Sequence, residues 1–269
     1  MASLKFQSLG PVGGPTLVCL HGFLGTGSDW GPFAQELHRL RPDLQILLPD
    51  LPGHGESVSI PPENFLDRLA ETLSAAGICR AMLAGYSLGG RLALAAAIAT
   101  PRHYPAFIGI STSAGLESPD ERSARREADA WLATRLRQDS FEDFLRAWWS
   151  LPVFSSPKKI PADEFLASRL TQTPAALAEV LEAWSPGDLP SLWSEIPAYP
   201  GSAMLVAGEC DSKFAPLACR MARAFSSAKA LILPGCGHRL LEEAPRRLAY
   251  AVAEFLPANF GIGPDGAEI

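Results

Sequence analysis

Three side chains in this sequence could together activate a serine for catalysis. Ser87 stands at the centre of residues 85–89, Gly-Tyr-Ser-Leu-Gly, which fit the pattern G-x-S-x-G. Asp211 and His238 follow it along the chain, so the order is serine, acid, histidine. In such a set the histidine takes the proton of the serine hydroxyl, and the acid holds the histidine in its working orientation. These residues predict a serine that acts as nucleophile or general base, with Glu209 as the alternative acid.

The elements that must position these residues follow from an alternation of short apolar segments and helical patterns. Strand-like segments cover residues 16–20, 44–48, 80–86, 107–111, 203–207 and 230–233. Helical patterns cover residues 30–40, 65–76, 88–99, 214–225 and 241–256. Such alternation predicts a mostly parallel sheet flanked by helices, because crossovers between parallel strands are right-handed and carry helices. Ser87, Asp211 and His238 each follow a predicted strand, which indicates the α/β class and the α/β-hydrolase fold.

The loop after the first predicted strand could stabilise a developing negative charge. Residues 21–25 read His-Gly-Phe-Leu-Gly. An oxyanion hole needs two backbone N–H groups aimed at the charge. We expect one from Phe23 and the other from Leu88, the residue after the serine.

The other histidines have structural or surface locations in this prediction. Residues 51–57, Leu-Pro-Gly-His-Gly-Glu-Ser, predict a structural turn rather than a catalytic element. His38 lies in a helical pattern and His103 near a proline, and both are expected to face solvent. His238 therefore remains the candidate base.

The middle of the chain has a different composition from the two blocks that flank it. Residues 113–197 are helical in pattern, rich in arginine, and hold five of the six tryptophans. They predict a helical cap inserted into a core formed by residues 1–112 and 198–256. Residues 257–269 contain several glycines and predict a flexible tail.

Composition excludes several classes of protein. The net charge of −6 does not favour a nucleic-acid partner, because binding to phosphates needs a basic face. Hydrophobic residues make up 47% of the chain, which predicts a large core. The five cysteines lack metal-site spacing and are expected to be reduced thiols. With no secretory signal and no apolar stretch long enough for a membrane, we expect a cytoplasmic protein.

Arg91 follows Ser87 by four positions and falls near the start of the helix that the elbow opens. A cation is unfavourable there, by a few tenths to about 1 kcal/mol, because the helix dipole is positive at that end. The position suggests either binding of an anion or a solvated surface arginine.

Six segments of the sequence resemble one family, the 2-succinyl-6-hydroxy-2,4-cyclohexadiene-1-carboxylate synthases of menaquinone and phylloquinone biosynthesis. The similar segments are residues 20–25 with 29–30, residues 85–91, residues 121–129, Trp148 with residues 151–154, residues 208–214, and residues 237–238 with Glu242 and Pro245. They extend over most of the chain. Cys210 departs from the family's pattern, since many members have a larger polar residue there.

The resemblance implies roles for residues outside the elbow. It implies the triad Ser87, Asp211 and His238. The substrate-binding residues that it implies are three arginines that contact carboxylates and two aromatic residues that line the pocket: Arg91, Arg125, Arg169, Tyr86 and Trp148. Arg122 and Arg126 are alternatives to Arg125.

The implied activity is a carbon–oxygen lyase that eliminates pyruvate from a small tricarboxylate. Ser87, activated by His238, would remove a ring proton, and no metal or organic cofactor is implied. Two alternatives remain open at this point. A carboxylester or C–C hydrolase would use the same residues through an acyl-enzyme, and a ligand receptor would use none of them. Oligomeric state does not follow from the sequence.

Overall fold

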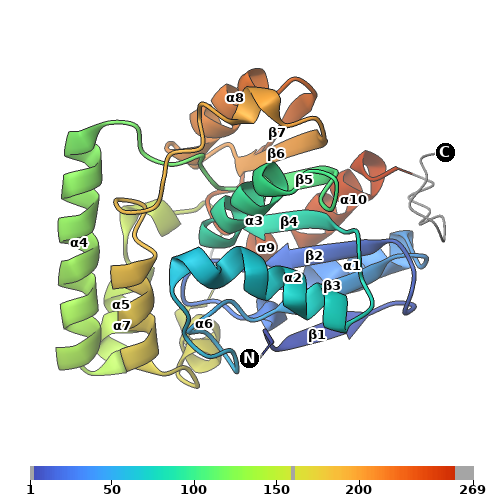
Figure 1. Cartoon of the computed structure of the whole chain (residues 1–269). Coiled ribbons are helices and arrows are strands. Elements are labelled where there is room, and N and C mark those ends of the chain that lie inside the picture. Colours follow the sequence, from blue (N-terminus) through green and yellow to red (C-terminus); the bar gives the residue numbers. More distant parts are fainter. Residues whose placement is uncertain (1–2, 159–160, 258–269) are drawn as a thin grey trace.

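The structure is a computed structural model that describes residues 3–158 and 161–257, and a seven-stranded sheet forms its centre (Figure 1). The strands are β1 (Phe6–Leu9), β2 (Thr16–Leu20), β3 (Gln45–Pro49), β4 (Met82–Tyr86), β5 (Ala106–Ile110), β6 (Ser202–Gly208) and β7 (Ala228–Leu233). Their order across the sheet is β1-β3-β2-β4-β5-β6-β7, and only β1 is antiparallel to its neighbour. This confirms the α/β fold and all six predicted strands, each to within two residues at both ends.

The strand β1 has no counterpart in the sequence prediction. Three of its four residues are exposed, so it lacks the apolar run that marks the central strands. It pairs with β3 from Phe6 opposite Pro49 to Leu9 opposite Ile46. Backbone hydrogen bonds rather than a buried face hold this edge, and such pairing leaves little trace in side-chain pattern.

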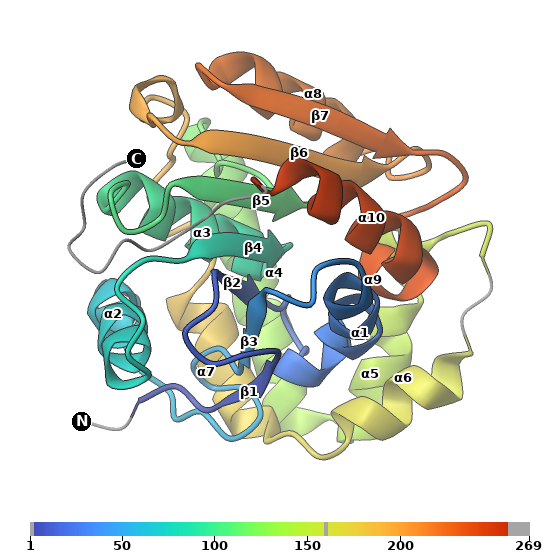
Figure 2. The same ribbon diagram turned by 90° about the vertical axis from the view of Figure 1, so that its right-hand side faces the viewer.

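Helices cover both faces of the sheet (Figure 2). One face carries α2 (Phe65–Ala75), α3 (Leu88–Ala99) and α8 (Phe214–Ala224), and the other carries α1 (Gly31–Leu40), α9 (Leu240–Glu243) and α10 (Pro245–Phe255). The single helix predicted over residues 241–256 was wrong. It is two helices, because Pro245 disfavours a helical conformation at Ala244, whose φ is −148° and ψ is 45°.

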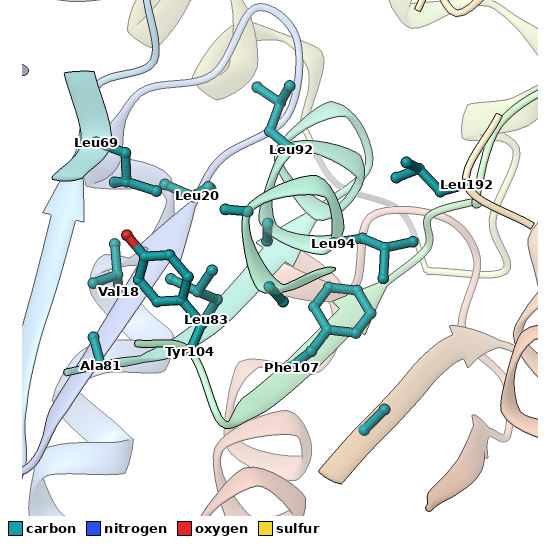
Figure 3. Close-up of a cluster of buried hydrophobic side chains, with 14 of the residues drawn as sticks. Val18, Leu20, Leu69, Ala81, Leu83, Leu92, Leu94, Tyr104, Phe107 and Leu192 are labelled. Carbon is teal, nitrogen blue, oxygen red and sulfur yellow. The ribbon is translucent and has the colours of Figure 1, made fainter. Parts of the chain in front are cut away.

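The helix α3 lies in the core and holds in place the turn between β4 and α3 that contains Ser87. Figure 3 shows Leu92 and Leu94 of α3 on the same side of the sheet as Val18, Leu83 and Phe107. Leu92 and Leu94 are 5% and 0% exposed, and burying each such side chain contributes roughly 1.5–3 kcal/mol. The elbow helix is therefore held by packing on all sides.

A helical segment lies in the chain between β5 and β6 and gathers on one side of the molecule in Figure 1. It contains α4 (Pro119–Gln138), α5 (Phe141–Trp149), α6 (Ala162–Arg169) and α7 (Pro174–Ala183). These helices share an apolar cluster of their own, with Phe144 and Leu177 fully buried. The segment falls inside residues 113–197, for which the sequence predicts a cap. The flexible tail predicted for residues 257–269 lies, apart from Pro257, outside the described residues.

Candidate active site

Ser87 has a strained backbone at the tip of β4. Its φ is 53° and its ψ is −112°, a conformation that costs of order 1–3 kcal/mol for a residue with a side chain. The N–H of Ser87 donates to the carbonyl of Ile110 over 2.9 Å, and Thr112 Oγ1 donates to the carbonyl of Ser87 over 2.7 Å. These bonds tie the elbow to the end of β5 and offset the strain.

The two glycines of the elbow are required by space. A Cβ on Gly85 would lie 2.3 Å from the carbonyl oxygen of Gly89. A Cβ on Gly89 would lie 2.3 Å from the carbonyl oxygens of Leu20 and His21. Backbone atoms cannot give way as side chains do, so only glycine fits where the elbow crosses the end of β2.

His238 and Asp211 form a buried pair at the ends of β7 and β6. His238 Nδ1 lies 2.6 Å from Asp211 Oδ2, and Asp211 Oδ1 accepts the N–H of Phe214 over 3.0 Å. Because Nδ1 donates to the carboxylate, Nε2 is left as the proton acceptor. The alternative acid, Glu209, is exposed and accepts the N–H of Gly235 over 3.0 Å, so it does not reach His238.

Ser87 and His238 open into one cavity of about 520 Å³ between the sheet and the helical segment. Phe23 and Leu88, the expected oxyanion-hole residues, line the same cavity. This position lies at the carboxyl ends of the adjacent strands β2 and β4, from which the chain continues to β3 on one side and to β5 on the other, and open α/β sheets bind their ligands at such a point.

The loop that carries Phe23 is held by a residue that sequence reasoning missed. Leu24 has a φ of 63°, and its carbonyl accepts a hydrogen bond from Nε2 of the buried Gln172. The Oε1 atom of Gln172 accepts the N–H of Gly55 over 3.2 Å. Gln172 therefore connects the loop that carries Phe23 to the turn at residues 51–57, a contact that fits the structural role predicted for that turn. Gln172 and Leu24 are 148 positions apart in the sequence, so no local pattern could have indicated the contact.

Two buried histidines support this loop without titrating near neutral pH. His21 Nε2 accepts the N–H of Leu51 over 2.8 Å, and His21 Nδ1 lies 2.8 Å from the carbonyl of Gly22. Burial lowers the pKa of His21 and that of His54 to about 3, because the charged form would lose its hydration. Both rings are neutral at pH 7. Of the two predicted surface histidines, His103 is exposed and His38 is only half-buried.

Arg91 is buried, which contradicts its interpretation as a surface arginine. Its exposed fraction is 4%, and its Nη1 has no hydrogen-bond partner among the described residues. Its Nη2 lies 3.4–3.5 Å from the carbonyls of Pro186, Leu189 and Pro190, which are long contacts. Burial lowers the pKa of Arg91 to about 10, with Arg125 and Arg122 contributing, so it is still charged at pH 7. The Arg91 guanidinium lines the cavity, and its Nη1 donors have no acceptor among the described residues.

Of the three candidate arginines on α4, Arg125 is the one that lines the cavity. Its Nε donates to Asp129 Oδ2 over 2.8 Å. Arg122 and Arg126 instead donate to the carbonyls of Leu189 and Gly187 over 3.1 and 3.0 Å. The structure thus distinguishes Arg125 from Arg122 and Arg126, which the sequence alone left as alternatives.

Arg169 and Tyr86 line a second, smaller pocket of about 40 Å³ beside the first. Arg169 donates from Nη1 and Nη2 to the two carboxylate oxygens of Asp29, over 2.7 and 2.8 Å. The structure therefore does not bring Arg169 to the larger cavity. Trp148 lines both pockets, together with Phe23 and Phe154.

Lys213 is a further cation on the wall of the larger cavity. Burial and the charge of Arg125 lower its pKa. In the sequence analysis Lys213 appears only as a member of residues 208–214, without a role of its own. Within residues 3–158 and 161–257, no three His, Cys, Asp or Glu residues are grouped as a metal site would need. In the same residues, no helix has the length and hydrophobicity that crossing a membrane demands.

Comparisons with known proteins identify a broad family and a narrower one within it. A sequence model described as the α/β hydrolase family matches residues 17–252. The 2-succinyl-6-hydroxy-2,4-cyclohexadiene-1-carboxylate synthase of Enterobacter sp. (strain 638) is 34% identical, over 92% of this chain and 93% of its own length. A putative enzyme of the same name from Bacillus subtilis (strain 168) is 32% identical over 92% of each chain. The structure of MenH from S. aureus superposes with a TM-score of 0.82 at 26% identity, over 95% of this chain and 98% of that one.

Proposed function

Since this chain belongs to the 2-succinyl-6-hydroxy-2,4-cyclohexadiene-1-carboxylate synthase family of the α/β hydrolases, we propose that it is a carbon–oxygen lyase of menaquinone or phylloquinone biosynthesis. Its substrate is 2-succinyl-5-enolpyruvyl-6-hydroxy-3-cyclohexene-1-carboxylate, from which it eliminates pyruvate. The observation that carries this proposal is Arg91, a buried guanidinium that lines the cavity beside Ser87 and lacks a carboxylate partner among the described residues.

The charges around the cavity support binding of a substrate with three carboxylates. Glu117 is paired with Arg220 over 2.7 Å, and Asp129 with Arg125 over 2.8 Å. Apart from these two ion pairs, the charged side chains that line the cavity are two cations, Arg91 and Lys213, and one carboxylate, Glu121. An anion that enters this cavity gains charge-assisted hydrogen bonds, and a planar guanidinium can hold a carboxylate through two of them.

Ser87 and His238 carry the proton in this mechanism. His238 Nε2 takes the proton of the Ser87 hydroxyl while Ser87 removes the ring proton next to the succinyl ketone. The bond electrons pass into the ketone and give an enolate. As the ketone re-forms, the ring double bond shifts, the bond from ring carbon to enolpyruvyl oxygen breaks, and the departing enolate is protonated to pyruvate. No bond joins the enzyme and the substrate at any stage.

The N–H groups of Phe23 and Leu88 stabilise the enolate oxygen. Gln172 supports this role by fixing the loop that carries Phe23, as described above. Trp148 lines both pockets and Tyr86 lines the smaller one, and burial keeps the pKa of Tyr86 well above its usual range. Arg169 lines the smaller pocket, where Asp29 accepts from both of its terminal nitrogens, so its contribution to carboxylate binding is secondary. The helical segment from α4 to α7 serves as the cap that excludes water from the reaction.

One assay tests the proposal. The purified protein is supplied with the enolpyruvyl substrate, and pyruvate release is measured together with absorbance of the conjugated diene. We expect one pyruvate and one diene for each substrate consumed. In parallel, the reaction is quenched in acid and the intact protein is weighed. An acyl adduct on Ser87, or turnover of aryl esters without pyruvate release, would instead identify a serine hydrolase.

A further inference from the structure

We propose that Arg239 forms a second carboxylate-binding site in the smaller pocket and receives one carboxylate of the tricarboxylate substrate. This inference rests on the proposed function for the identity of the ligand. Neither the motifs nor the relatives assign Arg239 a role. Arg239 would then determine specificity, because it would select substrates whose carboxylate reaches the smaller pocket while the reacting ring lies beside Ser87.

Arg239 is a buried cation whose donors are unused. Its exposed fraction is 8%, and its Nε and Nη1 are buried with no hydrogen-bond partner among the described residues. The carboxylate oxygen that the structure places nearest is Oε2 of Glu242, 3.9 Å from Nε, too far for a hydrogen bond. A buried donor without a partner destabilises the folded protein, and a charged donor does so more strongly than a neutral one. A ligand anion would remove that destabilisation.

A stack of rings and guanidinium groups fixes the plane of Arg239. Its Cζ lies 3.7 Å from the centroid of the Trp149 ring. The Trp149 ring lies 4.4 Å from that of Phe165, and Cζ of Arg169 lies 5.0 Å from the Phe165 ring. Stacking engages the face of the Arg239 guanidinium and leaves its edge, where the donors are, for a planar carboxylate.

The other charges of the smaller pocket leave Arg239 available. Four charged residues line it: Asp29, Arg169, Arg239 and Glu242. Asp29 and Arg169 neutralise each other through two hydrogen bonds. Glu242 is the competitor for Arg239, but its side chain is 32% exposed and can turn toward solvent. Burial raises the pKa of Glu242, and the charges of Arg239 and Arg169 oppose that rise, so Glu242 is a competitor that an incoming carboxylate has to displace.

The two pockets are placed for one ligand. Phe23, Trp148 and Phe154 line both, so the smaller pocket opens beside the cavity that holds Ser87 and His238. A volume of about 40 Å³ admits a carboxylate but no ring. The geometry therefore places the ring over Ser87 and one carboxylate arm against Arg239. Arg169 offers less, because Asp29 already occupies both of its terminal nitrogens.

The test compares variants of three residues near the carboxyl end of the chain. Arg239→Gln should raise KM for the enolpyruvyl substrate at least tenfold with a smaller change in kcat, because truncating one side of a buried charge pair weakens binding by that much or more. Arg239→Lys should restore part of the loss. Glu242→Gln removes the competitor and should lower KM. Arg246→Gln, which removes an exposed arginine of α10, is the matched control and should match the wild type.

A binding measurement keeps this test separate from the proposed reaction. The intrinsic tryptophan fluorescence, to which Trp149 contributes, is titrated with succinate and with pyruvate, which represent the two arms of the substrate. Loss of affinity for succinate in Arg239→Gln assigns the succinyl arm to the pocket, and loss for pyruvate assigns the enolpyruvyl arm. Unchanged affinity for both, with unchanged KM, overturns the proposal. If the wild type releases no pyruvate from the enolpyruvyl substrate, the proposed function fails, while the titration still decides whether Arg239 binds carboxylates.

Discussion

The Oγ atom of Ser156 donates to Oε2 of Glu243 over 2.7 Å, and the same carboxylate oxygen accepts the N–H of Gly237 over 2.6 Å. Oε1 of Glu243 accepts the N–H of Arg239 over 3.3 Å. Lys158 Nζ donates to the Glu243 carbonyl. One buried carboxylate thus holds the residues on both sides of His238 and joins them to the segment after α5.

Replacing Glu243 should loosen the histidine loop. Glu243→Ala leaves the N–H groups of Gly237 and Arg239 buried without acceptors, at about 1–3 kcal/mol each. We expect the free energy of unfolding to fall by at least about 2 kcal/mol in urea denaturation, with a loss in kcat. Ser156→Ala, the control, removes one donor and should cost about 1 kcal/mol or less. Equal losses in the two variants would contradict this role.

Ser87→Ala should abolish most turnover and preserve the fold. Loss of the reactive member of a triad lowers kcat by at least about 10³. The hydroxyl is not needed for the elbow, since the bonds to Ile110 and Thr112 use the backbone of Ser87. Pyruvate release and circular dichroism provide the measurements. A variant with more than a tenth of wild-type activity would remove Ser87 from the mechanism.

Arg91→Ala should lower kcat/KM. The corresponding loss of transition-state stabilisation is roughly 2–5 kcal/mol, the range for truncating one side of a desolvated charge pair. Arg91→Lys should recover only part, because it lacks the planar fork. Arg122→Ala is the control, since Arg122 does not line the cavity. Should Arg91→Ala and Arg122→Ala behave alike in pyruvate release, the carboxylate role of Arg91 is wrong.

Arg91→Met offers an independent check by stability. The buried Nη1 of Arg91 has no partner among the described residues, so an apolar side chain of similar length should remove an unfavourable charge. We expect a higher midpoint in urea together with low activity. A lower midpoint would indicate that the long contacts to the carbonyls at residues 186–190 are more stabilising than their distances suggest.

Acid should destabilise the protein through His21 and His54. Their pKa values are about 3 in the folded chain, against 6.5 for an unperturbed histidine. The unfolded state therefore binds more protons between pH 6.5 and pH 3, and the free energy of unfolding decreases as pH falls through that window. Each histidine contributes a slope of up to about 1.4 kcal/mol per pH unit.

A single substitution isolates one of these slopes. His54→Asn keeps a donor for the carbonyl of Pro52, which His54 Nδ1 contacts over 3.0 Å, but cannot gain a proton. The dependence of stability on pH, measured by urea denaturation between pH 7 and pH 5, should become shallower. His103→Asn, at an exposed position, should leave the slope as it is. The same slope in all three proteins would rule out His54 as a source of acid sensitivity.

The central strands and the elbow were predictable because their causes are local. Strands buried on both faces are continuous apolar runs, and β2 and β5 are buried at every residue. The glycines around Ser87 are required by backbone atoms a few residues away or at the end of β2. The order of serine, acid and histidine placed the site at one edge of the sheet. The exposed strand β1 was missed because it buries no continuous face.

What the sequence determined by itself was therefore the fold, the elbow and the identity of the family. What only the tertiary structure decided was which charged side chains line the two cavities. Arg122, Arg125 and Arg126 lie on neighbouring turns of α4, and the choice among them depends on how α4 packs against the chain near residues 186–190. Arg169 meets Asp29 across 140 residues, and Arg239 lies in a small pocket that helices α5 and α6 help to close. Periodicity and spacing report the forces that act along a few turns of chain. Pairing of buried charges depends on contacts between distant segments, which form only when the whole fold is assembled.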